Sequence, residues 1–304
     1  MTPQNGLLES SRELHNTLRR FRFCENPFQD LNERLALLTV VLGHRHVAGF
    51  GFAEENNEGS LRRIRDILVN HGIRTLITQQ LKGVSARVCE DVSHEIVDVF
   101  DRVDEQSARK FTGKVLWAFS SSEQAAIIGK AVRGEAQVGA LLGYPSCCVS
   151  RTLAMLSKGK TAFVKAIVAR VGEDPGAVEK ALRHDQKVEV PADTMMDANV
   201  PRTVERFPFV FHIACDTCLG SDTSPSAELN DRDGQVAASV DENFHDTIQR
   251  VAALLKQIEH TIRDTDGSLL DRNELDSRQQ ESLKALHRDC HQIHAEFLLG
   301  PQIG

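Results

Sequence analysis

The sequence has no excess of positive charge. Its 36 lysines and arginines are outnumbered by 43 aspartates and glutamates, which gives a net charge of −7. Nucleic acids and anionic membranes attract proteins mainly through clustered basic residues. We therefore expect no nucleic-acid partner and no membrane partner.

Long hydrophobic runs are also missing. The longest lies near residues 35–42, whereas a helix needs about 20 apolar residues to cross a bilayer. The first six residues lack the basic and apolar stretches of a signal peptide. We expect a cytoplasmic protein, and in that reducing compartment the seven cysteines should be thiols or metal ligands rather than disulfides.

The common cofactor fingerprints are absent as well. Gly49-Phe50-Gly51 lacks the third glycine of a dinucleotide loop and the Lys-Ser/Thr pair of a phosphate loop. Fingerprints of flavin and serine-hydrolase chemistry are not found either. These absences direct attention to the cysteines.

The chain of 304 residues, 41% of them hydrophobic, is long enough to bury one large core or two smaller ones. Its patterns predict an α/β or α+β fold in three regions. Residues 1–135 form a mixed α/β region, residues 136–240 a cysteine-rich region with the metal site, and residues 241–304 a helical hairpin.

The first region contains both helical and strand patterns. Some segments have apolar residues at helical spacing, and others are rich in β-branched, aromatic or alternating apolar residues. The predicted helices span residues 7–21 and 60–71, and the predicted strands span residues 73–78, 84–89 and 115–119. Ser121 and Gln124 have the spacing of a capping box, so a further helix should begin there.

Two apolar stripes predict the C-terminal hairpin. The first runs from Phe244 to Ile262 and the second from Leu283 to Phe297. The hairpin should cover the cysteine-rich site region or form a homodimer. His287, His291 and His294 lie along the second helix, where we expect a solvated stripe rather than a second metal site.

The first cysteine pair falls at a predicted helix start. A helix over residues 135–142 should end at Gly143, and Pro145 is well placed as the first residue of the next helix. Cys147 and Cys148 would then lie in its first turn. Free backbone N–H groups and the helix dipole stabilise thiolates there.

The second pair, Cys215 and Cys218, follows an alternating apolar segment over residues 207–213 that predicts a strand. A Cys-x-x-Cys turn closed by Gly220 is typical of a metal knuckle. A thioredoxin-like motif would start a helix at its first cysteine, whereas the next helix signal here is Ser224-Pro225. The pattern favours metal ligation over dithiol chemistry.

The adjacency of Cys147 and Cys148 bears on the identity of the metal. Neighbouring side chains on a helix point about 100° apart, so both sulfurs should reach one zinc ion only with strain. We therefore predict an iron–sulfur cluster, 4Fe-4S, held by these two residues with Cys215 and Cys218. Zinc is the alternative, with His212 as a further candidate ligand.

Residues near the cysteines supply candidate catalytic and binding groups. Tyr144, the only tyrosine, and His212 could move protons, although each could also be a packing residue. Ser224, Ser226 and Asn230 most simply cap a helix, but they could also hold a substrate carboxylate. Cys24, Cys89 and Cys290 fit apolar stripes and are expected in the core.

These residues predict a metal-dependent enzyme that acts on a small polar metabolite. A cluster with one open position suits sulfur transfer, dehydration or lyase chemistry. Two other classes stay open: a zinc-stabilised binding module without catalysis, and a thiol–disulfide redox switch.

The segment Leu-Gly-Tyr-Pro-x-Cys-Cys, residues 142–148, resembles the defining segment of an uncharacterised prokaryotic family. That family pairs it with a later His-x-x-Cys-x-x-Cys and a nearby serine, and the likeness covers residues 139–230. The resemblance implies that both cysteine pairs belong to one site, and it implies no particular reaction.

Overall fold

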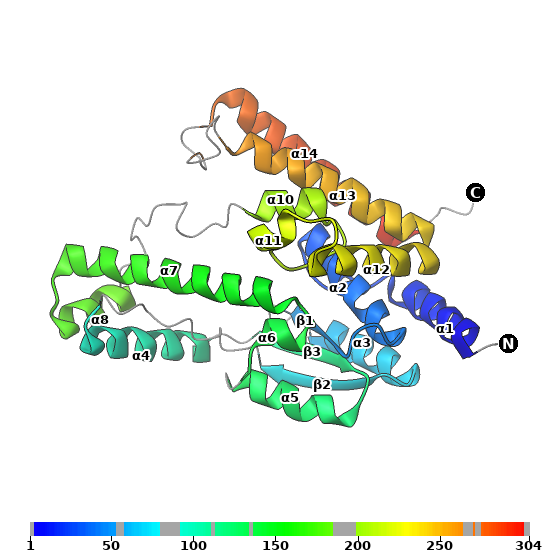
Figure 1. The fold of residues 1–304 in the computed structure, drawn as a ribbon, viewed down its shortest axis with the longest axis horizontal. Coiled ribbons are helices and arrows are strands. Elements are labelled where there is room, and N and C mark those ends of the chain that lie inside the picture. Colours follow the sequence, from blue (N-terminus) through cyan, green and yellow to red (C-terminus); the bar gives the residue numbers. More distant parts are fainter. Residues whose placement is uncertain are drawn as a thin grey trace.

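The chain has an α+β fold, in which a small antiparallel sheet is surrounded by helices (Figure 1). This confirms the fold class expected from the sequence. The computed structural model describes residues 3–52, 58–79, 92–110, 113–133, 136–184, 199–263, 270 and 275–300. The predicted strand over residues 84–89, with Cys89, lies outside these residues.

The sheet consists of β1 (Val47–Phe52), β2 (Arg74–Gln79) and β3 (Lys114–Phe119), in the order β1-β3-β2. Both pairs are antiparallel, and Leu116 of the central strand lies opposite Phe50 and Ile77. The strands expected over residues 73–78 and 115–119 are confirmed, whereas β1 was not expected. Helices α3 (Glu58–Asn70) and α4 (His94–Lys110) lie between successive strands along the chain.

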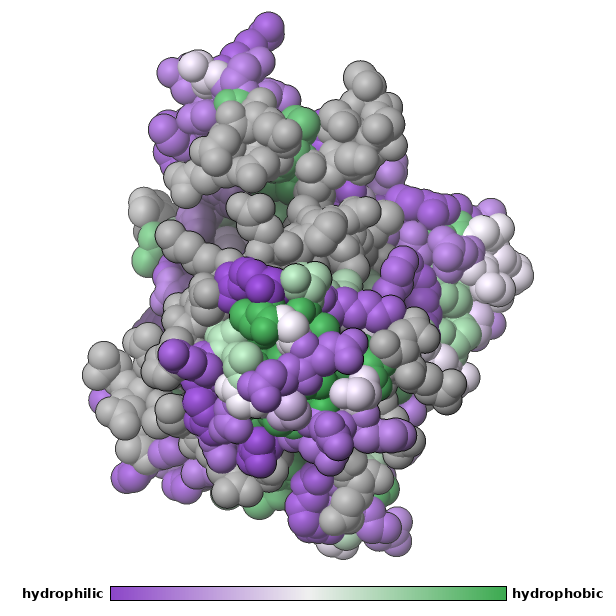
Figure 2. All heavy atoms as spheres, turned by 90° about the vertical axis from the view of Figure 1, so that its left-hand side faces the viewer, coloured by the Kyte–Doolittle hydropathy of each residue, from purple (hydrophilic) through white to green (hydrophobic). Residues whose placement is uncertain are grey.

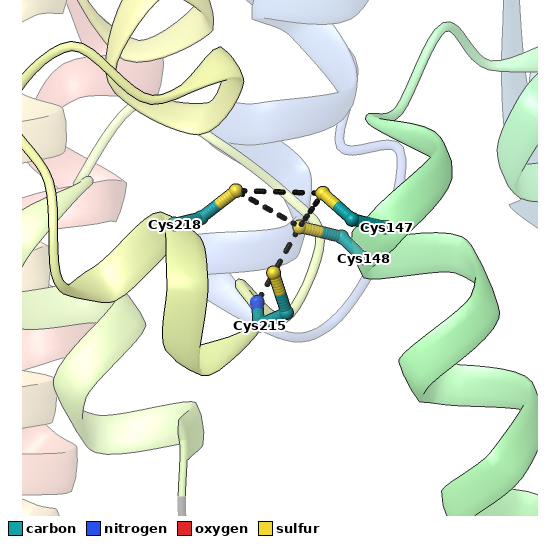
Figure 3. Close-up of side chains that lie close together, drawn as sticks. All are labelled: Cys147, Cys148, Cys215 and Cys218. Atoms are coloured by element: carbon teal, nitrogen blue, oxygen red, sulfur yellow. Dashed lines mark hydrogen bonds between the residues drawn. The ribbon is translucent and has the colours of Figure 1, made fainter.

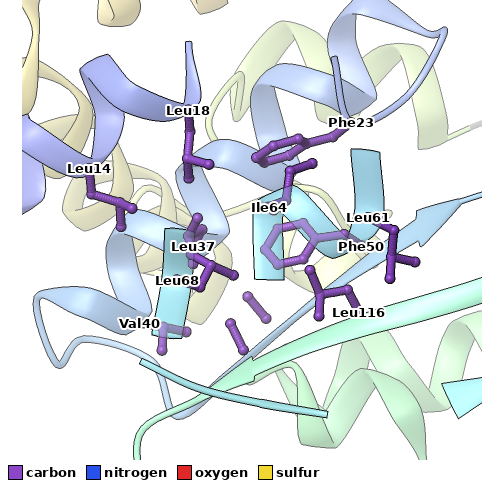
Figure 4. Close-up of a cluster of buried hydrophobic side chains, with 12 residues drawn as sticks. Leu14, Leu18, Phe23, Leu37, Val40, Phe50, Leu61, Ile64, Leu68 and Leu116 are labelled. Atoms are coloured by element: carbon purple, nitrogen blue, oxygen red, sulfur yellow. The ribbon is translucent and has the colours of Figure 1, made fainter. Parts of the chain in front are cut away.

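One face of the sheet is covered by α1 (Pro3–Leu18), α2 (Pro27–Val41) and α3. Phe50 and Leu116 point from the strands into an apolar cluster supplied by these helices (Figure 4). Trp117, the next residue along β3, belongs to the cluster that contains Ile128 of α5 (Ser122–Val132). The two faces follow the alternation of side chains along a strand.

Helix α2 also packs against the C-terminal hairpin. Its buried Leu31, Leu35 and Leu38 join a cluster that includes Phe244 of α13 (Glu242–Thr261) and Phe297 of α14 (Ser277–Leu299). The hairpin is thus confirmed, and its apolar stripes cover other parts of the same chain. A homodimer through these helices stays a prediction.

His294 corrects the expectation of a solvated histidine stripe. His287 and His291 are exposed, but His294 is fully buried, with Nε2 2.9 Å from Oδ2 of Asp30. Asp30 also accepts a hydrogen bond from the guanidinium of Arg34. The expectation failed because this part of α14 turns His294 towards α2 rather than towards solvent.

A long helix, α7 (Ser146–Val171), leads away from the sheet to a smaller core shared with α4 and α8 (Pro175–His184). Figure 2 views this end of the molecule, where a small hydrophobic area lies within a mostly hydrophilic surface. The helix before α7 is α6 (Val138–Leu141), which is shorter than the one expected over residues 135–142.

The described residues also form α10 (Asn199–Arg206), α11 (Asp216–Leu219) and α12 (Pro225–Val240). The strand expected over residues 207–213 is wrong, because these residues form an irregular segment. Pro208 has no backbone N–H to donate to a neighbouring strand. The N–H of Phe209 donates instead to the side chain of Asn230 over 3.1 Å. None of the helices in the described parts of the chain has both the length and the apolar character needed to cross a membrane.

Candidate metal centre

The structure brings the sulfurs of Cys147, Cys148, Cys215 and Cys218 within 4.8 Å of one another (Figure 3). Cys147 lies 3.9 Å from Cys148 and 3.6 Å from Cys218, and Cys148 lies 3.6 Å from Cys218. Two pairs that are about 70 residues apart in sequence therefore form one cluster. A cluster of four thiols is compatible with a metal site.

The first pair is placed by the start of α7. Gly143 has a φ of +76°, a left-handed conformation that glycine adopts without strain, and Pro145 is the N-cap of α7. Cys147 and Cys148 lie in the first helical turn, as expected. Their sulfurs are nevertheless only 3.9 Å apart, so adjacency on the helix does not prevent them from facing the same point.

The second pair lies on the single turn of α11. Cys215 is its N-cap and Cys218 lies within the turn, whereas the next helix was expected to begin only at Ser224. The backbone N–H of Cys215 points at Sγ of Cys148, with 3.4 Å from nitrogen to sulfur. Such a contact stabilises negative charge on the sulfur.

Helix α10 holds the segment before Cys215. Nδ2 of the buried Asn199 donates to the carbonyl of Ala214 over 3.1 Å and to the carboxylate of Asp216 over 3.1 Å. One turn later, the hydroxyl of Thr203 accepts a hydrogen bond from the N–H of Ala214 over 3.0 Å. Neither Asn199 nor Thr203 was expected at the site from the sequence. The two polar residues are four positions apart and therefore lie on the same face of a helix, which is the sequence pattern that could have indicated them.

Ser226 links the cysteines to His212. Its hydroxyl oxygen lies 3.5 Å from Sγ of Cys148 and 2.8 Å from Nε2 of His212. Among the described residues His212 is not part of the close group of ligand atoms, so it reaches the cluster through Ser226. Nδ1 of His212 is buried and has no hydrogen-bond partner among the described atoms.

The pKa values within the cluster diverge. Burial raises the pKa of Cys148 to about 12, and burial also raises the pKa of Cys147. Burial acts on Cys218 too, but hydrogen bonds from the hydroxyl and N–H of Ser226 and from the other two thiols outweigh it and lower the pKa to about 7. Cys218 is therefore partly ionised near neutral pH, and a bound cation would favour ionisation of the thiols that coordinate it.

His212 and Tyr144 lie beside each other, with ring centroids 5.0 Å apart. Burial lowers the pKa of His212 to about 4, with a smaller contribution from Arg45, so its ring is neutral at pH 7. Burial raises the pKa of Tyr144 to about 12, against the opposing charge of Arg45. Both side chains are therefore neutral near pH 7, where each can take part in hydrogen bonds.

The other predicted binding residues have local partners. Ser224 is the N-cap of α12: its hydroxyl accepts from the N–H of Ala227 and donates to the carbonyl of Cys218 over 3.0 Å. The side chain of Asn230 accepts from the N–H of Phe209. Of the three predicted substrate-binding residues, Ser226 is thus the one whose side chain contacts a cysteine sulfur.

A pocket of about 320 Å³ adjoins the cluster. Cys148, Tyr144 and His212 line it together with apolar side chains from α6, α7 and the segment before α11. These include Leu156 and Phe211, which are 44% and 42% exposed although large and apolar. The pocket thus combines an apolar wall with the polar groups nearest to the cysteines.

The remaining described cysteines lie apart from this cluster. Cys290 is buried in α14, as expected, and Cys24 is partly buried. No known protein family, curated protein or solved structure matches the chain. The resemblance of residues 142–148 to a prokaryotic family stays a prediction, and the cluster itself is the basis for the functional argument.

Proposed function

We propose that Cys147, Cys148, Cys215 and Cys218 bind one metal ion, most simply zinc, and that this ion organises a small-molecule pocket. The observation that carries the proposal is the spacing of the sulfurs. Zinc lies about 2.3 Å from each thiolate, which places the four sulfurs of a tetrahedral site about 3.8 Å apart. Three of the six sulfur–sulfur separations, 3.6, 3.6 and 3.9 Å, agree with this value, and all six are within 4.8 Å.

The sequence pattern favoured an iron–sulfur cluster, because the side chains of adjacent cysteines on a helix were expected to diverge. A four-iron cluster uses each thiolate on a different iron, so its ligands surround a larger body than a single ion. The sulfurs would have to move apart to hold it. We therefore place the iron–sulfur cluster second and keep it as a distinct outcome of the metal analysis.

The groups around the cysteines stabilise the thiolate forms that a metal ion requires as ligands. The sulfur of Cys148 accepts a hydrogen bond from the N–H of Cys215, and the sulfur of Cys218 accepts hydrogen bonds from the hydroxyl and the N–H of Ser226. The first turn of α7 adds the positive end of a helix dipole beside the first pair. These groups offset the repulsion between thiolates that a bound ion brings together.

The pocket favours a role in ligand binding or catalysis over a purely structural module. Cys148 belongs both to the cluster and to the pocket wall, so an ion that fixes this residue also fixes the wall. We propose a ligand that is mainly apolar and carries one hydrogen-bonding group near Tyr144 or His212. It would have a larger apolar part than the small polar metabolite expected from the sequence.

A second candidate role, catalysis at the metal, is favoured by the exposure of Cys147. The other three cysteines are buried, whereas Cys147 is exposed and is the ligand that a substrate could most readily replace. Sulfur transfer, dehydration or lyase chemistry would then occur at this position, as the sequence suggested.

Metal content, acid-labile sulfide and the visible spectrum of protein purified without oxygen test the proposal. We expect one zinc per chain, no sulfide and no colour. Brown protein with iron and sulfide would support the cluster instead. Protein without metal whose thiols oxidise reversibly would overturn both and favour the thiol–disulfide switch.

Cysteine variants separate the two metal roles. Cys148→Ser and Cys218→Ser should lose the metal and unfold at lower temperature, whereas Cys24→Ser should keep both properties and serves as the control. If the centre is catalytic, Cys147→Ser should keep the fold but change the metal environment. If it is structural, Cys147→Ser should lose stability as the buried ligands do.

A further inference from the structure

A second hollow, of about 360 Å³, also adjoins the segment before α7, where Gln137 lines both this hollow and the pocket beside the cysteines. Ala136, Ala140 and Gly143 line it, whereas Gly139 and Tyr144 line the pocket beside the cysteines. The hollow thus adjoins the segment that leads to the metal centre, but it is separate from the cysteine cluster.

The lining of this hollow is basic. His44, Arg45 and His46 come from the segment between α2 and β1, and Arg232 comes from α12. No aspartate or glutamate is among the described residues that line it. Because the chain as a whole carries a net charge of −7, this concentration of basic side chains does not reflect general composition.

Arg45 and Arg232 both contact the carboxylate of Asp233. The guanidinium of Arg45 forms an ion pair with Oδ2 of the buried Asp233, and Arg232 lies 3.2 Å from Oδ1 of the same residue. Two positive charges therefore share one negative charge, which leaves a net positive charge beside the hollow. The Arg45 side chain is only 7% exposed, and its Nε has no hydrogen-bond partner among the described atoms.

The remaining wall is apolar. Ile127 of α5, 40% exposed, and Leu141 of α6 both line the hollow. Gln124 and Gln137 add side-chain amides that can donate hydrogen bonds. Arginine forks suit the oxygens of phosphate and carboxylate groups, and an apolar wall suits the body of an organic molecule.

We propose that this hollow binds a small organic oxyanion, with its phosphate or carboxylate at Arg45 and Arg232 and its apolar part against Ile127 and Leu141. The inference is independent of the proposed metal function. It requires only the fold and the charges around the hollow.

Isothermal titration of the full chain as purified, with phenyl phosphate, benzoate and inorganic phosphate, tests the proposal. We expect at least one of the two organic anions to bind, and to bind more tightly than inorganic phosphate. The tighter of the two identifies the preferred oxyanion. Absence of binding by both would overturn the proposal, and equal binding of inorganic phosphate would overturn the role of the apolar wall.

Two variants locate the binding. Arg232→Gln removes one charged donor and should weaken binding about tenfold or more. Ile127→Asp places a negative charge at an exposed wall position and should abolish binding. Arg278→Gln and Val69→Asp make the same changes at exposed helical positions that do not line the hollow, and both should bind as the original chain does. Equal affinity in all four variants would show that the anion binds elsewhere.

Discussion

The ring of His212 is hydrogen-bonded to Ser226, with 2.8 Å between Nε2 and Oγ, although the two residues stand 14 positions apart. Ser226 has one hydroxyl proton, and the lowered pKa of Cys218 depends on a hydrogen bond from it. When that proton points to sulfur, the oxygen accepts from Nε2–H of His212. His212 therefore positions the serine that stabilises the thiolates.

Replacement of Ser226 by alanine should weaken metal binding. The variant removes a hydrogen bond from sulfur, and the loss of such outer contacts lowers metal affinity by about 10- to 100-fold. Competition with a chromophoric chelator at pH 7 measures the change. Ser239→Ala, on the same helix but bonded to the carbonyl of Val236, is the control. Equal affinities in the two variants would limit Ser226 to a packing role.

His294 should contribute more to stability than the other two histidines of its stripe. It is fully buried and hydrogen-bonded to Asp30, so His294→Ala leaves a cavity and removes one of the hydrogen bonds to this buried carboxylate, which keeps its contact with Arg34. We expect a loss of about 2–4 kcal/mol in the free energy of unfolding, measured with urea. His287→Ala and His291→Ala, at exposed positions on the same helix, should each change it by less than about 0.5 kcal/mol. A loss of similar size in all three variants would contradict the assigned role of the Asp30 contact.

The cysteine segments were predictable because their geometry is set locally. Gly143 and Pro145 end one helix and begin the next, and this placed Cys147 and Cys148 in a first turn before any contact was known. Ser224 and Pro225 likewise marked the start of α12. Glycine and proline restrict the backbone only at their own and neighbouring positions. Their effect on where a helix ends or begins can therefore be predicted from the local sequence.

Features that depend on distant contacts were missed. β1 contains Gly49 and Gly51, which weaken a strand pattern, but a Cβ atom at Gly49 would lie 2.8 Å from the ring of Trp117 on β3. The alternation of phenylalanines over residues 207–213 predicted a strand, whereas Phe209 is held by Asn230 from α12. In both cases a partner far along the chain decides the local structure.

Gly139→Ala should disturb the contact between α6 and α7. A Cβ atom at Gly139 would lie 2.8 Å from Cγ2 of Val149, which is closer than carbon atoms can approach without movement. We expect a loss of about 1–3 kcal/mol in the free energy of unfolding and weaker ligand binding in the pocket that both residues line. Thermal and urea unfolding measure the first effect.

Gly129→Ala provides the control for this substitution. Gly129 lies on α5, and its added Cβ would meet only the end of the Arg133 side chain at 3.5 Å. Alanine is favoured over glycine within a helix by about 1 kcal/mol, so this variant should gain stability. A gain in Gly139→Ala as well would show that Val149 moves aside without cost.

Glu33 gives the protein a distinct dependence on pH. Burial raises its pKa from an ordinary 4.5 to about 7, against a smaller opposing effect of the Gln29 hydrogen bond. Between these two values the folded state binds more protons than the unfolded chain, so the free energy of unfolding contributed by this group falls as pH rises. Above pH 7 the buried carboxylate is ionised, and the protein loses the full free energy of unfolding that the shifted pKa of Glu33 represents.

Glu33→Gln should therefore be more stable than the original chain at pH 8, by about 2–3 kcal/mol, and should differ little from it near pH 5. Urea unfolding over this range measures the difference, and any metal contribution is common to both proteins. Glu25→Gln, at a side chain that is 89% exposed, should show no such trend. If Glu33→Gln proved less stable at pH 8, attraction of the carboxylate to Arg34 would have to outweigh the cost of its burial.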